Sequence, residues 1–143
     1  MNKLVRFGVS IEKDLHDKFN EGIKKLGYEN RSEAIRDLMR NSFVEDKWNR
    51  NSIVVGGISI VYDHHKRELL NKIMDLQHNY HEIIISTQHV HLTHNDCLEI
   101  LITKGKSQTI KGLYGKIKAL KGVGHVSIMQ SGILSEIIKL DEK

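Results

Sequence analysis

Apolar and polar side chains alternate along residues 4–10, where the polar face carries Arg6, Gly8 and Ser10. A period of two, with β-branched residues on the apolar face, predicts a strand. A lone strand of this length is not stable, and no second strand follows nearby in the chain. We therefore expect this strand to pair with its own copy in a second chain.

Two stretches with helical spacing of apolar residues come next. Ser10 is placed to cap the first helix, and Gly27 is placed to end it. Asn30 and Glu33 have the spacing of a capping box, which marks the start of the second helix. Residues 1–46 therefore predict a strand, a helix, a turn and a second helix.

The periodicity breaks at residues 47–52, which we interpret as a linker between domains 1–50 and 51–143. The second domain shows strand and helix patterns in the order βαββαβ, the ferredoxin-type arrangement. Its expected elements are strand 53–61, helix 64–78, strand 81–91, strand 97–103, helix 107–120 and strand 123–130. The predicted fold class is α+β.

Composition narrows the class of protein. The chain has 143 residues, 39% hydrophobic and 28% charged, which is typical of a globular protein. Cys97 is the single cysteine, so no intramolecular disulfide forms, and no apolar run is long enough to span a bilayer. We expect a cytoplasmic protein without a membrane partner.

The net charge of +4 is shared equally by residues 1–52 and the remainder, so charge does not single out a DNA-binding half.

A two-stranded ribbon is one way to enter the DNA major groove. Arg6 can bond guanine through two hydrogen bonds, Ser10 can bond any base edge, and Gly8 lets the backbone come close. Arg31 and Ser32, at the start of the second helix, would offer N–H groups and a positive charge to a phosphate. The alternative is a swapped dimer that binds no nucleic acid, and periodicity alone leaves both open.

The string from Gly27 to Asp37 reads Gly-Tyr-x-Asn-Arg-Ser-Glu-Ala-Ile-Arg-Asp. Together with Arg6-x-Gly8-x-Ser10, it makes residues 3–43 resemble the ribbon-helix-helix repressors. The resemblance implies a dimeric βαα module in which the polar strand residues read bases. Gly8 departs from the polar side chain that is usual there.

A histidine cluster dominates the second domain. His89 and His91 stand two apart on one predicted strand, so their side chains share a face. Cys97 begins the next strand, and a hairpin can therefore present two imidazoles and one thiolate to one ion. His78 and His81, near the end of the preceding helix, are candidates for a fourth ligand.

Imidazole and thiolate ligands exclude Ca²⁺ and Mg²⁺ and suit Zn(II), Cu(II), Ni(II) or Co(II). Spacing does not choose among these four. The alternative to a metal site is that His89, His91 and Cys97 stand close together by chance. Catalysis by Cys97 is disfavoured because no oxyanion-hole or substrate motif accompanies it. We expect the remaining histidines to be solvated: His16, His64, His65, His94 and His125.

The string His89-Val90-His91-x-x-His94-x-Asp96-Cys97-Leu98-Glu99, preceded by Gln77-His78, resembles the nickel-responsive regulators over residues 3–132. That family resemblance implies one Ni(II) per subunit, bound by His89, His91 and Cys97 together with His78 of another subunit. It also implies an ACT-like regulatory domain and a homotetramer built as a dimer of dimers.

Further roles follow from the same resemblance. Lys66 and Arg67 would touch the DNA backbone, and Gln77 and Glu99 would support the metal ligands. A second, weaker cation site is implied as well, at Glu33 and Asp37.

The resemblance predicts a repressor, not an enzyme, that binds a palindromic operator when Ni(II) is bound and controls nickel uptake. Two alternatives stay open. One is a metal storage or chaperone protein, and the other is an ACT-type small-molecule sensor fused to a ribbon-helix-helix module.

Overall fold

The computed structural model of the chain describes residues 4–137. The chain divides into two compact units, Met1–Met39 and Arg40–Lys143. The division falls inside a helix, before the boundary predicted at residue 50. The first three residues of the predicted first domain and the last six of the second lie outside the described residues.

The first unit holds helix α1 (Lys13–Lys25) and the beginning of helix α2 (Arg31–Asn49). Residues 4–12 have no regular secondary structure in the single chain, and the predicted strand, which needs a second chain, stays a prediction. The expected cap at Ser10 is wrong. The backbone stays extended to Glu12, which is the N-cap residue, so α1 begins later than Ser10 would allow.

The turn between the helices follows the sequence prediction. Gly27 has a φ of +80°, a left-handed conformation that favours glycine, and its N–H donates to the carbonyl of Lys24. The N–H of Tyr28 donates to the carbonyl of Ile23. The N–H of Glu33 donates to Asn30 Oδ1 at 2.9 Å, which confirms Asn30 as the cap of α2.

The predicted linker at residues 47–52 is wrong in its first half, because α2 continues to Asn49. The reason is Trp48, whose side chain is only 1% exposed and belongs to the core of the second unit. Burial of the indole favours helix where the polar neighbours predict a linker. The chain leaves the helix near Asn51, which has a φ of +56°.

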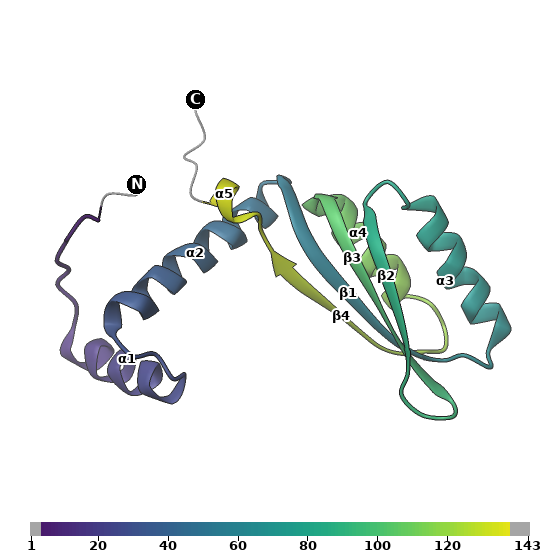
Figure 1. Cartoon of the computed structure of the whole chain (residues 1–143), viewed down its shortest axis with the longest axis horizontal. Helices are drawn as coiled ribbons and strands as arrows, with labels where there is room; N and C mark the ends of the chain where they lie inside the picture. Colours follow the sequence, from purple (N-terminus) through teal and green to yellow (C-terminus); the bar gives the residue numbers. More distant parts are fainter. Residues whose placement is uncertain (1–3, 138–143) are drawn as a thin grey trace. The chain divides into compact units, whose positions relative to one another are not determined.

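The second unit is built around a four-stranded sheet (Figure 1). Its strands lie in the order β2-β3-β1-β4, and every neighbouring pair is antiparallel. This order confirms the ferredoxin-type βαββαβ prediction. The elements are β1 (Ile53–Asp63), α3 (Arg67–Asn79), β2 (Ile84–His91), β3 (Asp96–Lys106), α4 (Ser107–Lys118), β4 (Val123–Ser131) and α5 (Leu134–Ile137).

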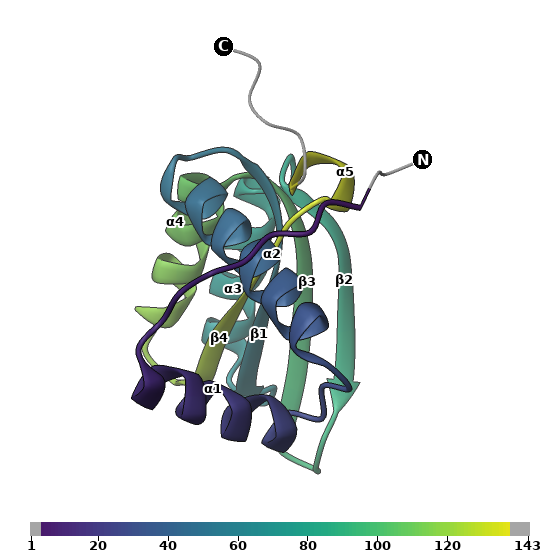
Figure 2. The same cartoon turned by 90° about the vertical axis from the view of Figure 1, so that its left-hand side faces the viewer.

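Helices α3 and α4 lie on one face of the sheet, as the two views show (Figures 1 and 2), and the core fills the space between. Alternate residues of β1 point into this core, since side chains alternate along a strand. The fully buried apolar side chains there are Val54, Ile58, Ile60, Tyr62, Leu101, Ile73, Ile110, Leu113 and Ile117.

Two element boundaries differ from the prediction near the histidines. Helix α3 begins at Arg67 and not at residue 64, because Asp63 Oδ1 accepts the N–H of His65 at 3.0 Å and holds residues 64–66 in a turn. Strand β2 begins at Ile84 and not at residue 81. Within residues 4–137, none of the helices has the length and hydrophobicity that crossing a bilayer requires.

Candidate metal centre

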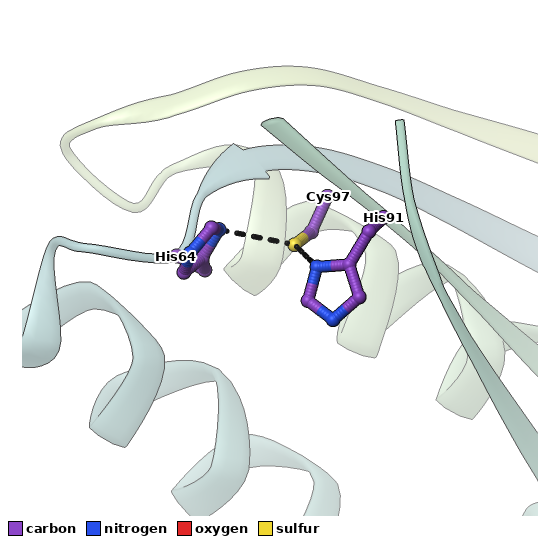
Figure 3. A group of neighbouring side chains, drawn as sticks. All are labelled: His64, His91 and Cys97. Atoms are coloured by element: carbon purple, nitrogen blue, oxygen red, sulfur yellow. Dashed lines mark hydrogen bonds between the residues drawn. The ribbon is translucent and has the colours of Figure 1, made fainter. Parts of the chain in front are cut away.

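The candidate centre is formed around Cys97, at the start of β3. In the sheet, Cys97 pairs with His91 of β2 on one side and with Tyr62 of β1 on the other. Its Sγ lies 3.2 Å from His91 Nδ1 and 3.3 Å from His64 Nδ1 (Figure 3). The ligand atoms of His64, His91 and Cys97 all lie within 4.8 Å of one another. One thiol and two imidazoles therefore already converge in a single chain.

His89 lies on the same face of β2 as His91, with 5.0 Å between the ring centroids. Its Nδ1 is 3.4 Å from the hydroxyl of Tyr62, and its sheet partner is Glu99. The predicted hairpin thus presents both imidazoles on the side of the sheet where the thiol lies. Within the described residues, the ligand group around Cys97 includes His91 but not His89.

His64 is the residue that the sequence analysis missed. We expected it to be solvated, but it is half-buried beside Cys97. The register explains this position, because Asp63 pairs with Asp96 and the next residue in the turn reaches the thiol. Sequence spacing alone gives no signal for it, since His64 and Cys97 meet only through the pairing of β1 with β3.

A buried hydrogen-bond network lies beside the hairpin. Glu99 is 6% exposed, and its two carboxylate oxygens accept from different donors. The Tyr62 hydroxyl donates at 2.7 Å and the Gln77 amide donates at 2.5 Å. Burial, reinforced by Glu99, raises the pKa of Tyr62 well above its usual range. Gln77 and Glu99 are thus brought together, and Glu99 is the sheet partner of His89.

His78 follows Gln77 near the end of α3 and is exposed. A surface depression of about 390 Å³ is lined there by Met74, Gln77, His78, His81 and Ile84. The His81 ring nitrogen Nδ1 lies 2.8 Å from the backbone carbonyl oxygen of His78. Within residues 4–137, the ligand group around Cys97 does not include His78.

The electrostatics favour a bound cation. Burial raises the pKa of the Cys97 thiol, and the carboxylates of Asp96, Asp63 and Glu99 raise it further. The thiol is therefore protonated near neutral pH in the chain by itself, and metal binding would release that proton. A sulfur with imidazole nitrogens, flanked by carboxylates, is a donor set that fits a divalent transition metal.

The remaining predicted site residues lie at the surface. Ser32 and Arg31 are exposed in the first turn of α2, and Arg6, Gly8 and Ser10 are exposed in the segment before α1. Lys66 and Arg67 are exposed at the start of α3, directly after the turn that carries His64. The contacts of these residues with DNA stay predictions.

Glu33 and Asp37 lie one turn apart on α2, and each already has a protein partner. Glu33 pairs with Arg36, and Asp37 accepts a hydrogen bond of 2.5 Å from the Tyr28 hydroxyl. Among the described residues, these two carboxylates are not part of a group of three metal ligands. A cation bound between them would compete with these partners.

The sequence was compared with known families and proteins. Residues 55–131 match the model of the NikR C terminal nickel binding domain. A protein of Syntrophus aciditrophicus is 50% identical over 93% of this chain and 97% of its own length. One from Dictyoglomus thermophilum is 47% identical over 94% of this chain and its full length. The names of both place them among the nickel-responsive regulators.

Solved structures resemble the sheet unit. An uncharacterized protein of Thermotoga maritima aligns with a TM-score of 0.51 at 21% identity, covering 55% of this chain and 98% of its own. This similarity shows the fold alone. The ACT domain from GTP pyrophosphokinase of Chlorobium tepidum aligns with a TM-score of 0.45 at 17% identity, covering 55% of this chain and all of its own.

Proposed function

The chain belongs to the nickel-responsive regulator family, and on this basis we propose that it is a nickel-dependent transcriptional repressor. With Ni(II) bound, it binds a palindromic operator in double-stranded DNA and controls genes for nickel uptake. The observation that carries the proposal is the convergence of the buried Cys97 thiol with the imidazoles of the β2–β3 hairpin.

We propose that His89, His91 and Cys97 of one subunit hold the ion with His78 of a neighbouring subunit, one ion per subunit. The position of His78 supports this, because it is exposed on α3 and is not grouped with Cys97 within the described part of one chain. Bound Ni(II) supplies positive charge to a thiolate that lies among carboxylates. Glu99, held by Tyr62 and Gln77, orients the hairpin imidazoles.

The proposed assembly is a homotetramer, a dimer of dimers, with an ACT-like regulatory domain in each subunit. The sheet face opposite the helices supports assembly, since it carries Val55, Val61 and Ile100 together with Met129, which is 59% exposed. Apolar surface of this kind marks an interaction site when it is contiguous.

For DNA binding, we propose that Arg6 and Ser10 read base edges from an intermolecular ribbon, with the backbone at Gly8 close to the groove. Arg31 and Ser32 would bind phosphate at the N-terminus of α2, where backbone N–H groups lack helical partners. Phosphate contacts of this kind position a protein on DNA, whereas base contacts give specificity.

Lys66 and Arg67 supply the proposed link between metal and DNA. His64, held at Cys97, and Lys66 lie in the same short turn before α3. A metal-ordered centre would fix this turn and hold both cations against phosphates. Because a ligand shifts an equilibrium only through differential affinity, Ni(II) must bind the DNA-competent arrangement more tightly.

We further propose a second, weaker cation site at Glu33 and Asp37. These carboxylates lie one turn apart on α2, so their oxygens can reach one cation. Binding there would replace the contacts with Arg36 and Tyr28.

Two other functions compete with this proposal: metal storage or delivery, and small-molecule sensing by the sheet unit. The family names favour regulation by nickel over both, and over catalysis. A DNA-binding regulator acts in the cytoplasm, which is the compartment that we propose.

The deciding experiment selects DNA from a random library with nickel present, then measures affinity for the selected sequence with and without Ni(II). We expect tight, nickel-dependent binding by the wild type and loss of the nickel dependence in Cys97→Ala. His125→Ala is the matched control, because His125 is exposed on β4. A thiolate-to-nickel absorption band should be present in the wild type and absent from Cys97→Ala.

Other outcomes favour the rival functions. Equal DNA affinity with and without Ni(II), in the wild type and in Cys97→Ala, excludes nickel-dependent DNA binding. Nickel binding without any sequence-specific footprint favours storage or delivery. DNA binding that is unchanged after dialysis against a chelator favours a small-molecule sensor.

A further inference from the structure

Three metal-binding side chains converge within one chain, without any residue of a neighbour. The ligand atoms of His64, His91 and Cys97 lie within 4.8 Å of one another, and the sulfur is 3.2 Å and 3.3 Å from the two imidazole nitrogens (Figure 3). Zinc binds thiolate and imidazole at distances that place donors around one tetrahedral ion roughly 3.4–3.6 Å apart. The sulfur–nitrogen distances are close to this spacing, so small side-chain movements would admit an ion.

The backbone fixes His64 at this place. Its N–H donates to the carbonyl of Asn95 at 3.3 Å, in the turn of the β2–β3 hairpin. The preceding residue, Asp63, pairs with Asp96 in the sheet. His64 is therefore attached to the same hairpin that carries the other two donors, and its position does not depend on another subunit.

The three side chains differ in exposure. Cys97 is buried, His64 is half-buried and His91 is exposed. The two imidazole rings meet at 78°, with 5.5 Å between their centroids. An ion at this place would have the sulfur on its buried side and two nitrogens nearer the surface, where water can reach its fourth position.

His89 is held by other groups and is not part of this set. Its Nδ1 lies 3.4 Å from the Tyr62 hydroxyl, which donates its proton to Glu99 at 2.7 Å. The hydroxyl oxygen can therefore accept from Nδ1–H of His89, which leaves the lone pair of this ring on Nε2. Within the described residues, the single-chain set thus consists of three protein donors.

Metal ions differ in the arrangement that they need. Three protein ligands and one water complete a tetrahedral zinc site. A square-planar arrangement, which is typical of Ni(II) and Cu(II), requires all four donors in one plane. The proposed nickel set reaches four protein donors by adding His89 and a neighbour's His78. The single-chain set needs neither of them and suits a tetrahedral ion.

We propose that His64 is a metal ligand in a second binding mode, in which His64, His91 and Cys97 of one subunit hold Zn(II) with water as the fourth ligand. This inference rests on the proposed function and deepens it, because both modes use His91 and Cys97 and therefore exclude each other. Zinc bound through His64 leaves His78 of the neighbouring subunit without a metal and does not fix α3 of that neighbour. His64 thus separates zinc from the ion that acts as the signal.

The first test compares zinc with nickel in the full chain. Affinities for Zn(II) and for Ni(II) are measured by competition with a chromophoric chelator in the wild type, His64→Gln and His78→Ala. His64→Gln removes an imidazole but keeps an N–H donor for the sulfur. Both histidines lie at least partly at the surface, so neither substitution disturbs the core.

The two substitutions should have opposite effects on the two metals. Loss of a group that only supports a ligand costs about 10- to 100-fold in affinity, so we expect His64→Gln to weaken zinc by about 100-fold or more and nickel by less than about tenfold. His78→Ala should weaken nickel and leave zinc at the wild-type affinity. His125→Ala, at an exposed position on β4, is the control and should change neither.

X-ray absorption at the zinc edge counts the imidazoles directly, which a merely structural role of His64 would not change. We expect one sulfur and two imidazoles around zinc in the wild type and in His78→Ala, and one imidazole fewer in His64→Gln. Around nickel, the number of imidazoles should be the same in the wild type and in His64→Gln. An unchanged imidazole count around zinc in His64→Gln, or zinc binding weakened by His78→Ala, overturns the inference.

The outcomes separate this inference from the proposed function. If DNA affinity responds to nickel but zinc binding does not depend on His64, this inference alone fails. If zinc binding depends on His64 but DNA affinity does not respond to nickel, the proposed function fails and the zinc site remains.

Discussion

At the scale of single residues, the chemistry of the candidate centre is set by what surrounds Cys97. Its sulfur is buried and lies near two imidazoles. Three nearby carboxylates disfavour a negative charge on this sulfur. A bare thiolate is therefore unfavourable there, whereas a thiolate bound to a divalent cation is stabilised by the same carboxylates. Burial and the negative charge of the carboxylates together thus favour a metal-bound thiolate over a free one.

His64 provides a test of this arrangement. We predict that His64→Ala weakens nickel binding by about 10- to 100-fold, the usual effect of removing a group that supports a metal ligand. The thiolate-to-nickel absorption band should remain, because Cys97 still binds. Calorimetry and absorption spectra of His64→Ala, with His65→Ala as the neighbouring control, measure both effects. Loss of the band in His64→Ala would contradict the prediction, because it would show that Cys97 does not bind the ion without His64.

Tyr28 gives a prediction for pH. Its hydrogen bond to Asp37 raises the pKa of the Tyr28 hydroxyl above its usual value near 10. Because the folded-state pKa is the higher one, the bond stabilises the folded chain fully below the unfolded value. That contribution is lost as the pH rises through the folded-state pKa.

An alkaline titration followed by NMR of labelled Tyr28 measures this shift. In Asp37→Asn, which removes the negative charge, Tyr28 should ionise at a lower pH than in the wild type. Identical titration curves in the two proteins would mean that the Tyr28–Asp37 bond does not form in solution.

At the scale of secondary structure, turns and register decide where the functional residues lie. Gly27 ends α1 in a left-handed conformation, and the cap at Asn30 then starts α2 with Arg31 and Ser32 in its first turn. In the second unit, pairing of β1 with β3 brings the turn after Asp63 to the start of β3. Each proposed binding group therefore depends on a specific backbone feature a few residues away.

We predict that Gly27→Ala destabilises the first unit by about 1–3 kcal/mol, because alanine is strained at a positive φ. Thermal unfolding of the full chain, followed by circular dichroism, gives the change. Gly115→Ala, at an exposed position within α4, should instead stabilise the protein by roughly 0.5–1 kcal/mol, since alanine favours helix over glycine. Equal effects of the two substitutions would contradict the role assigned to the Gly27 turn.

At the scale of the whole molecule, we propose that the first unit binds DNA and the second binds nickel. Residues of α2 belong to both units. The sheet unit has the larger described core, whereas the described apolar residues of the first unit include exposed Leu15, Leu26 and Leu38. A unit of this size with so much exposed apolar surface is expected to need a partner. This agrees with the proposed dimer of ribbon-helix-helix modules.

Metal binding should change the stability of the sheet unit. A ligand that binds only the folded state at 100 times its dissociation constant stabilises that state by about 2.7 kcal/mol. We therefore expect Ni(II) to raise the unfolding temperature reversibly, with recovery after a chelator is added. Calorimetric scans with Ni(II), Mg²⁺ and chelator test this. A rise with Mg²⁺ equal to that with Ni(II) would argue against a centre of imidazole and thiolate.

The sequence by itself determined the βαββαβ order, the turn at Gly27, the cap at Asn30 and the hairpin that carries His89, His91 and Cys97. These features follow from local spacing and from conformational preferences that act over a few residues. Only the tertiary structure decided that His64 meets Cys97 and that Trp48 extends α2 into the core. Both depend on contacts between residues far apart in the chain, where burial overrides local preference.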